Sequence, residues 1–140
     1  MPVVSVRISD DELYGRLRQN AQHHGQGIST LAGRLIDEGL RMEAHPAVMF
    51  RDGPEGRRAA LAAGPEIVDV IGALIGGDVP VDERPARAAQ LLNISPDAVD
   101  AALGYYADFT DEIDEELAQR ARAAQEAEAA WARQRALLES

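Results

Sequence analysis

The chain of 140 residues contains no cysteine and no lysine, so that all 14 basic residues are arginine. Without cysteine there is no disulfide, no thiolate chemistry and no sulfur-ligated zinc or iron–sulfur site. Uncharged stretches such as 61–65 fall far below the roughly 18 apolar residues that a membrane-spanning helix needs. The N-terminus also lacks a basic region followed by an apolar stretch and a cleavage site. We therefore expect a cytoplasmic protein.

Negative charge is in excess, with a formal net charge of −10. Phosphate contacts need a cationic face, and this excess argues against nucleic-acid binding by the whole surface. The charge is −1 over residues 1–45, −5 over residues 46–108 and −4 over residues 109–140. We therefore expect only the N-terminal part to meet a polyanion. The acidic remainder suits a basic protein partner or serves solubility.

The chain begins with the pattern of a strand followed by a helix. Apolar and other side chains alternate over residues 2–9, with the period of two that is typical of a half-buried strand. Ser9 and Glu12 form a capping box, which predicts a helix from near Asp10. Glycines after His24 interrupt the apolar periodicity and predict its end there.

A second helix is predicted from a cap at residues 28–30 to about Met42. Its broad apolar stripe comprises Leu31, Ala32, Leu35, Ile36, Gly39 and Leu40. A strand and two helices are too little to bury a core of their own. A lone edge strand with one apolar face also requires a partner strand. We therefore expect residues 1–44 to dimerise by pairing the strand with a copy of itself.

A second domain is expected over residues 45–109, because the proline of the His-Pro pair at 45–46 disfavours helix continuation. Strands at 48–51 and 57–61 flank a turn rich in glycine and proline, which predicts a β-hairpin. Pro65 is expected in the first turn of a following core helix.

Two further helical patterns complete the chain. Residues 84–106 predict a helix–turn–helix whose second helix is capped by Ser95, with Pro96 at its first position. From Thr110, five acids among six residues open an alanine-rich helix to Leu138. Such a helix spans roughly 40 Å at about 1.5 Å per residue, which is longer than a small core covers and suits an arm.

Four features of residues 3–42 occur together: the alternating strand, an Asp-Asp-Glu-Leu helix start, a glycine-containing turn before Ile28, and Arg-Leu-Ile-Asp-Glu-Gly-Leu at 34–40. In this order they resemble the ribbon-helix-helix family of repressors and antitoxins of the Arc/MetJ/CopG type, and in particular VapB-like antitoxins. In that family two strands form an antiparallel ribbon that enters the major groove. The resemblance implies a homodimer on double-stranded DNA whose core comprises Val4, Val6, Ile8, Leu35, Ile36 and Leu40.

The outward side of such a ribbon carries Val3, Ser5 and Arg7, because their alternates pack on the helices. Arg7 is suited to donate two hydrogen bonds to guanine, Ser5 bonds several base edges, and Val3 offers only apolar contact. Val3 departs from the family, in which polar residues are expected. Ser29 and Thr30, at the start of the second helix, place backbone N–H groups and hydroxyls on a phosphate.

The second domain carries a looser resemblance. Its features are Phe50-Arg51-Asp52-Gly53, the helix ending at Leu74, and the segment 91–106. They are similar to a small domain of unassigned biochemistry that accompanies antitoxins paired with PIN-like ribonuclease toxins. Asp97 and Asp100 lie where the helix–turn–helix would meet a groove, and carboxylates repel phosphates. We therefore favour packing, dimerisation or toxin contact for this element over DNA reading.

The C-terminal helix has a seam comprising Leu117, Ala121, Ala124, Trp131 and Leu138. One large aromatic on a face of small residues is suited to anchor in a partner's groove, which makes Trp131, with Leu117 and Leu138, the predicted partner-binding set. The alternatives are a solvated helix, a self-associating coil, and folding back on its own domain.

Catalytic patterns are weak. His23 and His24 are adjacent and hence about 100° apart on a helix, without a carboxylate at metal-binding spacing. Residues 52–56 lack the lysine and following helix of a nucleotide loop and are expected to form a turn. We expect no enzyme, no catalytic or metal site and no cofactor.

The fold predicted from these patterns is mainly α with short β: a ribbon-helix-helix dimerisation module (1–44), a small helical domain with a β-hairpin and helix–turn–helix (45–109), and an acidic C-terminal helix (110–140). The leading hypothesis is an antitoxin-type transcriptional repressor that binds its own promoter and neutralises a toxin, expected to be a PIN-like ribonuclease. Two alternatives remain open: a dimeric protein-interaction adaptor that never touches DNA, and a stand-alone regulator without a toxin.

Overall fold

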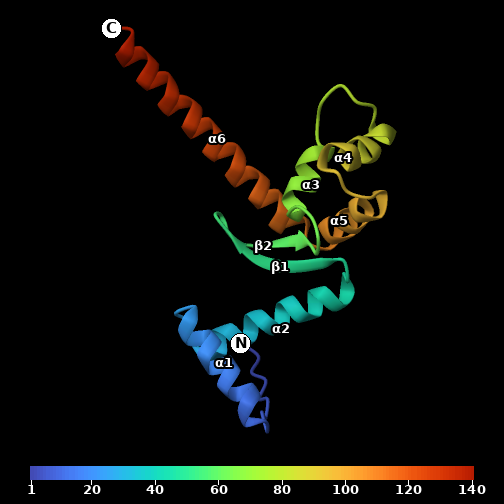
Figure 1. Cartoon of the computed structure of the whole chain (residues 1–140), viewed down its shortest axis with the longest axis vertical. Coiled ribbons are helices and arrows are strands. Elements are labelled where there is room, and N and C mark those ends of the chain that lie inside the picture. Colours follow the sequence, from blue (N-terminus) through green and yellow to red (C-terminus); the bar gives the residue numbers. More distant parts are fainter. The chain divides into compact units, whose positions relative to one another are not determined.

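The computed structural model describes all 140 residues and is mainly helical, with one two-stranded antiparallel sheet (Figure 1). The chain divides into two compact units, Met1–Ala44 and His45–Ser140. None of its helices combines the length and the apolar composition that crossing a bilayer requires.

The first unit contains helices α1 (Asp11–His23) and α2 (Ile28–Ala44). Asp10 is the N-cap of α1, and its side chain accepts a hydrogen bond of 2.9 Å from the backbone N–H of Glu12. The predicted cap at Ser9 is therefore wrong by one residue, because the aspartate carboxylate already satisfies an N–H group of the first turn. Gly25 has a φ of 62°, a left-handed conformation that glycine adopts without strain, and reverses the chain between the helices.

The second unit begins with a β-hairpin of β1 (Val48–Gly53) and β2 (Gly56–Leu61). The strands pair antiparallel from Val48 opposite Leu61 to Gly53 opposite Gly56, which confirms the predicted hairpin and extends both strands toward the turn. Gly56 has a φ of 105°, which a side chain would disfavour, and so the tight two-residue connection requires glycine there.

Helix α3 (Ile67–Leu74) follows the hairpin. Glu66 is its N-cap, and the backbone N–H of Glu66 donates to a carboxylate oxygen of Asp69 at 3.2 Å. Pro65 was predicted in the first helical turn but lies before the cap. The reciprocal capping pair of Glu66 and Asp69 moves the start of the helix, because it satisfies groups that would otherwise be orphaned.

A 3₁₀ turn, η1 (Val81–Glu83), leads into α4 (Arg84–Leu92), α5 (Pro96–Asp108) and α6 (Thr110–Leu138). The turn between α4 and α5 places Asn93 at a φ of 54°, and the Ser95 side chain accepts the N–H of Ala98 at 3.1 Å. Both features, a left-handed residue after one helix and a side-chain cap before the next, are common at helix ends. Helix α6 has the bounds that the sequence predicts.

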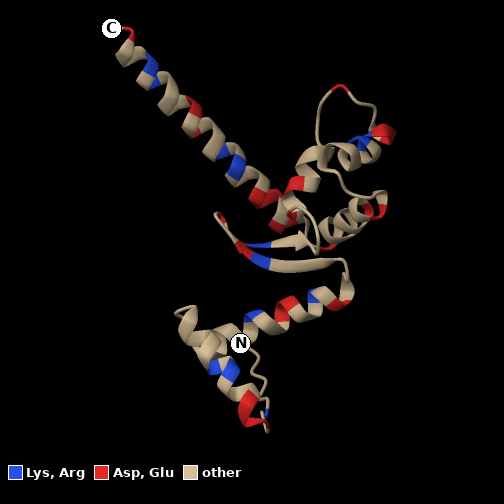
Figure 2. Cartoon of the chain, in the orientation of Figure 1, with Lys and Arg blue, Asp and Glu red and all other residues tan.

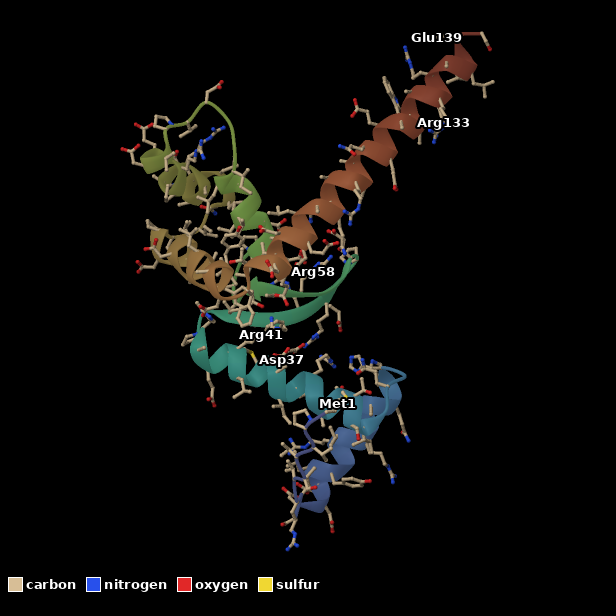
Figure 3. All side chains as sticks on the ribbon, turned by 180° about the vertical axis from the view of Figure 1, so that it is seen from behind. Met1, Asp37, Arg41, Arg58, Arg133 and Glu139 are labelled. Atoms are coloured by element: carbon tan, nitrogen blue, oxygen red, sulfur yellow. The ribbon has the colours of Figure 1, made fainter.

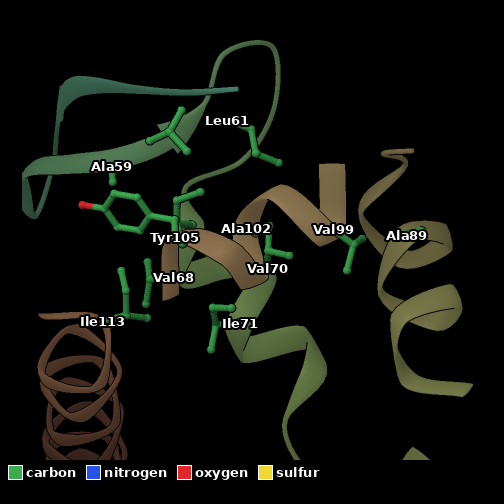
Figure 4. Close-up of a cluster of buried hydrophobic side chains, with 12 residues drawn as sticks. Ala59, Leu61, Val68, Val70, Ile71, Ala89, Val99, Ala102, Tyr105 and Ile113 are labelled. Carbon is green, nitrogen blue, oxygen red and sulfur yellow. The ribbon is translucent and has the colours of Figure 1, made fainter. Parts of the chain in front are cut away.

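The core of the second unit lies around α3, which packs against β2, α4, α5 and α6. Its largest member is Tyr105 of α5, which is fully buried (Figure 4). The Tyr105 hydroxyl donates a hydrogen bond to Glu112 at 2.7 Å. The buried apolar residues are Val48, Ala59, Leu61, Ile67, Val68, Val70, Ile71, Ala89, Val99, Ala102, Tyr105 and Ile113. The hairpin and four helices therefore share one hydrophobic core, which includes the beginning of α6.

Truncation at the centre of this core tests the packing. Ile67 is 0% exposed, whereas Ile75, just beyond the same helix, is 61% exposed. We expect Ile67→Ala to lower the free energy of unfolding by about 2–5 kcal/mol, since it removes buried methylene groups and leaves a cavity. Ile75→Ala should change it by no more than about 0.5 kcal/mol. Chemical denaturation followed by circular dichroism measures both, and equal effects would contradict the central position of α3.

Candidate functional site

Residues 2–9 form no hydrogen-bonded strand within a single copy of the chain. The predicted strand is absent because its ladder needs a partner strand, and the chain offers none at this segment. Val4 is 83% and Val6 68% exposed, while Ile8 is half-buried. Large apolar side chains are thus left in solvent where a second strand would cover them.

The two helices of the first unit carry a matching uncovered surface. Ala21 and Leu31 are buried. In contrast, the predicted dimer residues Leu35, Ile36 and Leu40 are all exposed, together with Leu13. A hollow of about 220 Å³, lined by Leu13, Arg16, Leu17, Asn20 and Leu35, opens between α1 and α2. The first unit therefore has an apolar face that it cannot bury by itself.

Three of the five arginines of the first unit form no ion pair within the chain. Arg34 contacts Glu38 at 3.4 Å and Arg41 contacts Asp37 at 3.0 Å, both along α2. Arg7, Arg16 and Arg18 are exposed and lack such a carboxylate partner. Sequence reasoning selected Arg7 but missed the two arginines of α1. For Arg18 the signal was present, because no acid lies four residues to either side of it.

The remaining DNA-binding candidates are also in the first unit. Val3 and Ser5 are exposed within the N-terminal segment. Ser29 and Thr30 are exposed in the first turn of α2, whose start at Ile28 makes them helical residues and not caps. Backbone N–H groups in a first turn have no intrahelical acceptor, and the positive end of the helix dipole lies there. All five predicted contacts are thus accessible in one copy.

The helix–turn–helix of α4 and α5 exposes acids at the start of its second helix. Asp97 and Asp100 are both in solvent, in the position that a recognition helix would present to DNA. The first unit carries five arginines and six acids, whereas the second carries nine arginines and 18 acids. Cationic groups for a phosphate backbone are therefore concentrated, relative to acids, in the first unit.

The base of α6 is fixed to the second unit by Arg120. Its guanidinium contacts Glu55 of the hairpin turn at 3.1 Å, Glu66 at 2.8 Å and Asp69 of α3. Partial burial disfavours the charged form, but hydrogen bonds to Asp69 and Glu55 outweigh it, and the pKa of Arg120 lies above its ordinary value. No sequence pattern predicts this cluster, because Arg120 lies more than 50 residues from each of the three acids.

A second charged contact lies one turn earlier. The Glu116 carboxylate is 5% exposed and lies 3.3 Å from the Arg58 guanidinium of β2. Burial raises the pKa of Glu116 above its usual value, and the charge of Arg58 acts in the opposite direction. Arg58 also donates to Gln119 at 3.2 Å. These contacts hold the first three turns of α6 on the hairpin.

Beyond Arg120, the helix leaves the body of the unit (Figure 3). We call residues 121–138 the arm. Within it Trp131 is 60% and Leu138 82% exposed, and the Arg135 guanidinium carbon lies 5.5 Å from the centroid of the Trp131 ring. Leu117, which the sequence grouped with them, packs against the core instead. The predicted partner-binding set is thus divided, because only its last two members lie on the arm.

No family model, curated protein or solved structure matches this chain.

The histidines do not converge with other ligand-type side chains. His23 and His24 contact each other edge to face near the end of α1. His45 lies 2.8 Å from Asp108 and packs edge to face on Tyr105. No three side chains of His, Asp or Glu are placed to hold a metal ion.

Replacing Arg120 tests the anchor of α6. Arg120→Met keeps the aliphatic stem but removes the charge opposite three acids, which would then repel one another. We expect a loss of about 1–3 kcal/mol in the free energy of unfolding, as for hydrogen bonds to charged groups. Arg133 on the arm has no such contacts, and Arg133→Met should stay within about 0.5 kcal/mol. Equal stability of both variants in chemical denaturation would show that the ion cluster does not hold the helix.

Proposed function

We propose that this protein is a dimeric, antitoxin-type repressor whose N-terminal segments pair into a ribbon on double-stranded DNA. The observation that carries the proposal is the uncovered apolar surface of the first unit beside an unpaired, alternating segment. Val4 and Val6 on the segment and Leu35, Ile36 and Leu40 on α2 are exposed together. A second copy would bury all of them in one step, because an isologous contact joins the same surface of both chains.

Pairing the segments also determines which side chains face DNA. Residues alternate between the two sides of a strand, so a ribbon that buries Val4, Val6 and Ile8 presents Val3, Ser5 and Arg7 on its other side. A two-stranded ribbon fits the major groove. Arg7 is exposed and takes part in no ion pair, which leaves its planar guanidinium available for two hydrogen bonds to guanine.

Backbone contacts would come from the same unit. The N–H groups at Ser29 and Thr30 suit a phosphate at the start of α2. Arg16 and Arg18 supply two further exposed guanidinium groups without carboxylate partners. The charge of −1 on the first unit, against −9 on the second, favours the first unit as the one that approaches DNA.

The acidic surface of the second unit would bind the partner toxin, for which a PIN-like ribonuclease remains the candidate. The support is the excess of acids on this unit, which suits a partner with a basic, RNA-binding surface. Asp97 and Asp100 at the helix–turn–helix belong to this acidic surface.

Arg7→Ala is the decisive change for DNA binding. We expect it to weaken specific binding to the DNA upstream of the protein's own gene by about 1–3 kcal/mol, because it removes a bidentate base contact. Binding of the wild type should also fall as salt rises, since phosphate contacts release counterions. Titration of labelled DNA at two salt concentrations, with an unrelated fragment for comparison, gives both quantities.

Arg133→Ala is the matched control, because Arg133 is an exposed arginine on the arm, outside the proposed interface. It should bind DNA like the wild type. Equal binding by the Arg7 and Arg133 variants would refute the ribbon as reader. Absence of specific binding by the wild type, with and without a co-purifying toxin, would leave the dimeric adaptor as the better description.

A further inference from the structure

The arm is a helix without a covering surface in its own chain. Every residue from 121 to 138 is exposed except Ala130, which is half-buried. At about 1.5 Å per residue these 18 residues form roughly 27 Å of helix. Trp131 and Leu138 therefore remain in water in one copy, although large apolar side chains usually gain free energy by burial.

One face of the arm has a heptad pattern. Ala124, Trp131 and Leu138 are separated by seven residues each and so lie along one line of the helix. Glu128 and Arg135 are also seven residues apart, and both lie on the same edge of this line. Trp131 thus lies at the centre of this face, with Ala124 on one side along the helix and Leu138 on the other. Glu128 and Arg135 lie along one edge of the face.

We propose that the arm pairs with the arm of a second copy, antiparallel, with Trp131 of each chain at the centre. The occupant is assigned by charge complementarity. When two such helices run antiparallel about a point next to residue 131, the same edge of each helix faces the other. Glu128 then lies beside Arg135 of the second copy. The same contact occurs twice by symmetry.

A parallel pair lacks this match. In a parallel pair, the edge that carries Glu128 and Arg135 lies beside the opposite edge of the second copy, where Ala123, Ala130 and Leu137 carry no charge. Opposite charges at facing positions stabilise helix pairs, and only the antiparallel arrangement brings Glu128 beside Arg135 of the second copy, so the charge pattern favours it.

The side chains on this edge are available for the contact. Glu128 forms no ion pair within the chain. Arg135 pairs with Glu139 at 2.8 Å, but both side chains are more than half exposed, and such a surface pair is readily exchanged. Arg135 also lies over the Trp131 ring, from where it would reach the second copy's acid while shielding the indole.

The charge of the arm itself permits self-association. It carries three arginines and two glutamates, a net of +1, although the chain as a whole carries −10. Its two glutamates lie between arginines on either side, whereas five acids gather in the first turns of α6 on the body of the unit (Figure 2). Net repulsion therefore does not oppose the pairing of two arms.

The pairing does not depend on the proposed DNA binding, because the ribbon and the arm share no residue. Arm variants should leave the affinity for DNA unchanged in the Arg7 assay, and Arg7→Ala should leave the arm contact intact. Failure of one proposal is thus distinguishable from failure of the other.

A charge exchange on the full-length protein tests the proposal. Glu128→Arg and Arg135→Glu each place like charges at both symmetric contacts. Each should shift the equilibrium between paired and separate arms about tenfold toward separate arms, by the usual strength of surface charge pairs. The double variant restores opposite charges and should recover the pairing.

Trp131 is the only tryptophan of the chain and reports the contact directly. Acrylamide quenching and the emission maximum show whether its indole is covered, and sedimentation shows the number of copies. Arg135→Glu also removes the arginine that lies over the Trp131 ring, and this change alone can alter quenching. We therefore compare proteins that have the same residue at position 135. The wild type is compared with Glu128→Arg, and Arg135→Glu is compared with the double variant.

The opposite face supplies the matched control. Glu126 and Arg133 are also seven residues apart but lie on the far side of the arm. Glu126→Arg and Arg133→Glu should therefore leave quenching unchanged. A wild-type Trp131 as accessible as free indole overturns the proposal, and so does unchanged quenching in Glu128→Arg. An equal loss of arm pairing in the variants on both faces also overturns it, because the effect of charge would then not be specific to the proposed face.

Discussion

Helix α3 is the element on which the second unit depends. Its side chains at Ile67, Val68, Val70 and Ile71 are all buried, and the hairpin, α4, α5 and the base of α6 each pack on one of its sides. A short helix that is apolar nearly all round is stable only when other elements enclose it. The capping pair of Glu66 and Asp69 serves this arrangement in two ways, because it starts α3 and also supplies carboxylates to Arg120. The residues at the start of α3 thus also help to hold the base of α6 on the unit.

The first unit has no such central element. Two helices and an extended segment bury Ala21 and Leu31 but leave Leu35, Ile36 and Leu40 exposed, since a surface of this size cannot be closed by so few residues. In the proposed function, the covering surface comes from a second copy of the chain. The arm likewise leaves the large side chain of Trp131 exposed in a single chain. Both proposed contacts between copies therefore lie at apolar surfaces that a single chain leaves exposed.

Local patterns predicted the elements well. The hairpin, the two helices of the first unit, the helix–turn–helix and the long last helix follow from alternation, periodicity and glycine or proline at their ends. Two of the errors concern helix starts. Asp10 caps α1 in place of the predicted Ser9, and Glu66 caps α3, so that Pro65 lies before the helix and not in its first turn. The strand predicted at residues 2–9 is absent from the single chain, which offers no partner strand at this segment.

The sequence by itself determined the order and type of the elements, the charge of each segment, and the candidate residues Val3, Ser5, Arg7, Ser29 and Thr30, because these depend on neighbours along the chain. Only the tertiary structure decided that Leu117 belongs to the core while Trp131 and Leu138 stand on an exposed arm. It also decided that Arg120 joins the hairpin turn to α3 and α6. The Arg120 contacts join residues more than 50 positions apart, and no local periodicity predicts which distant side chains will share a buried or charged contact.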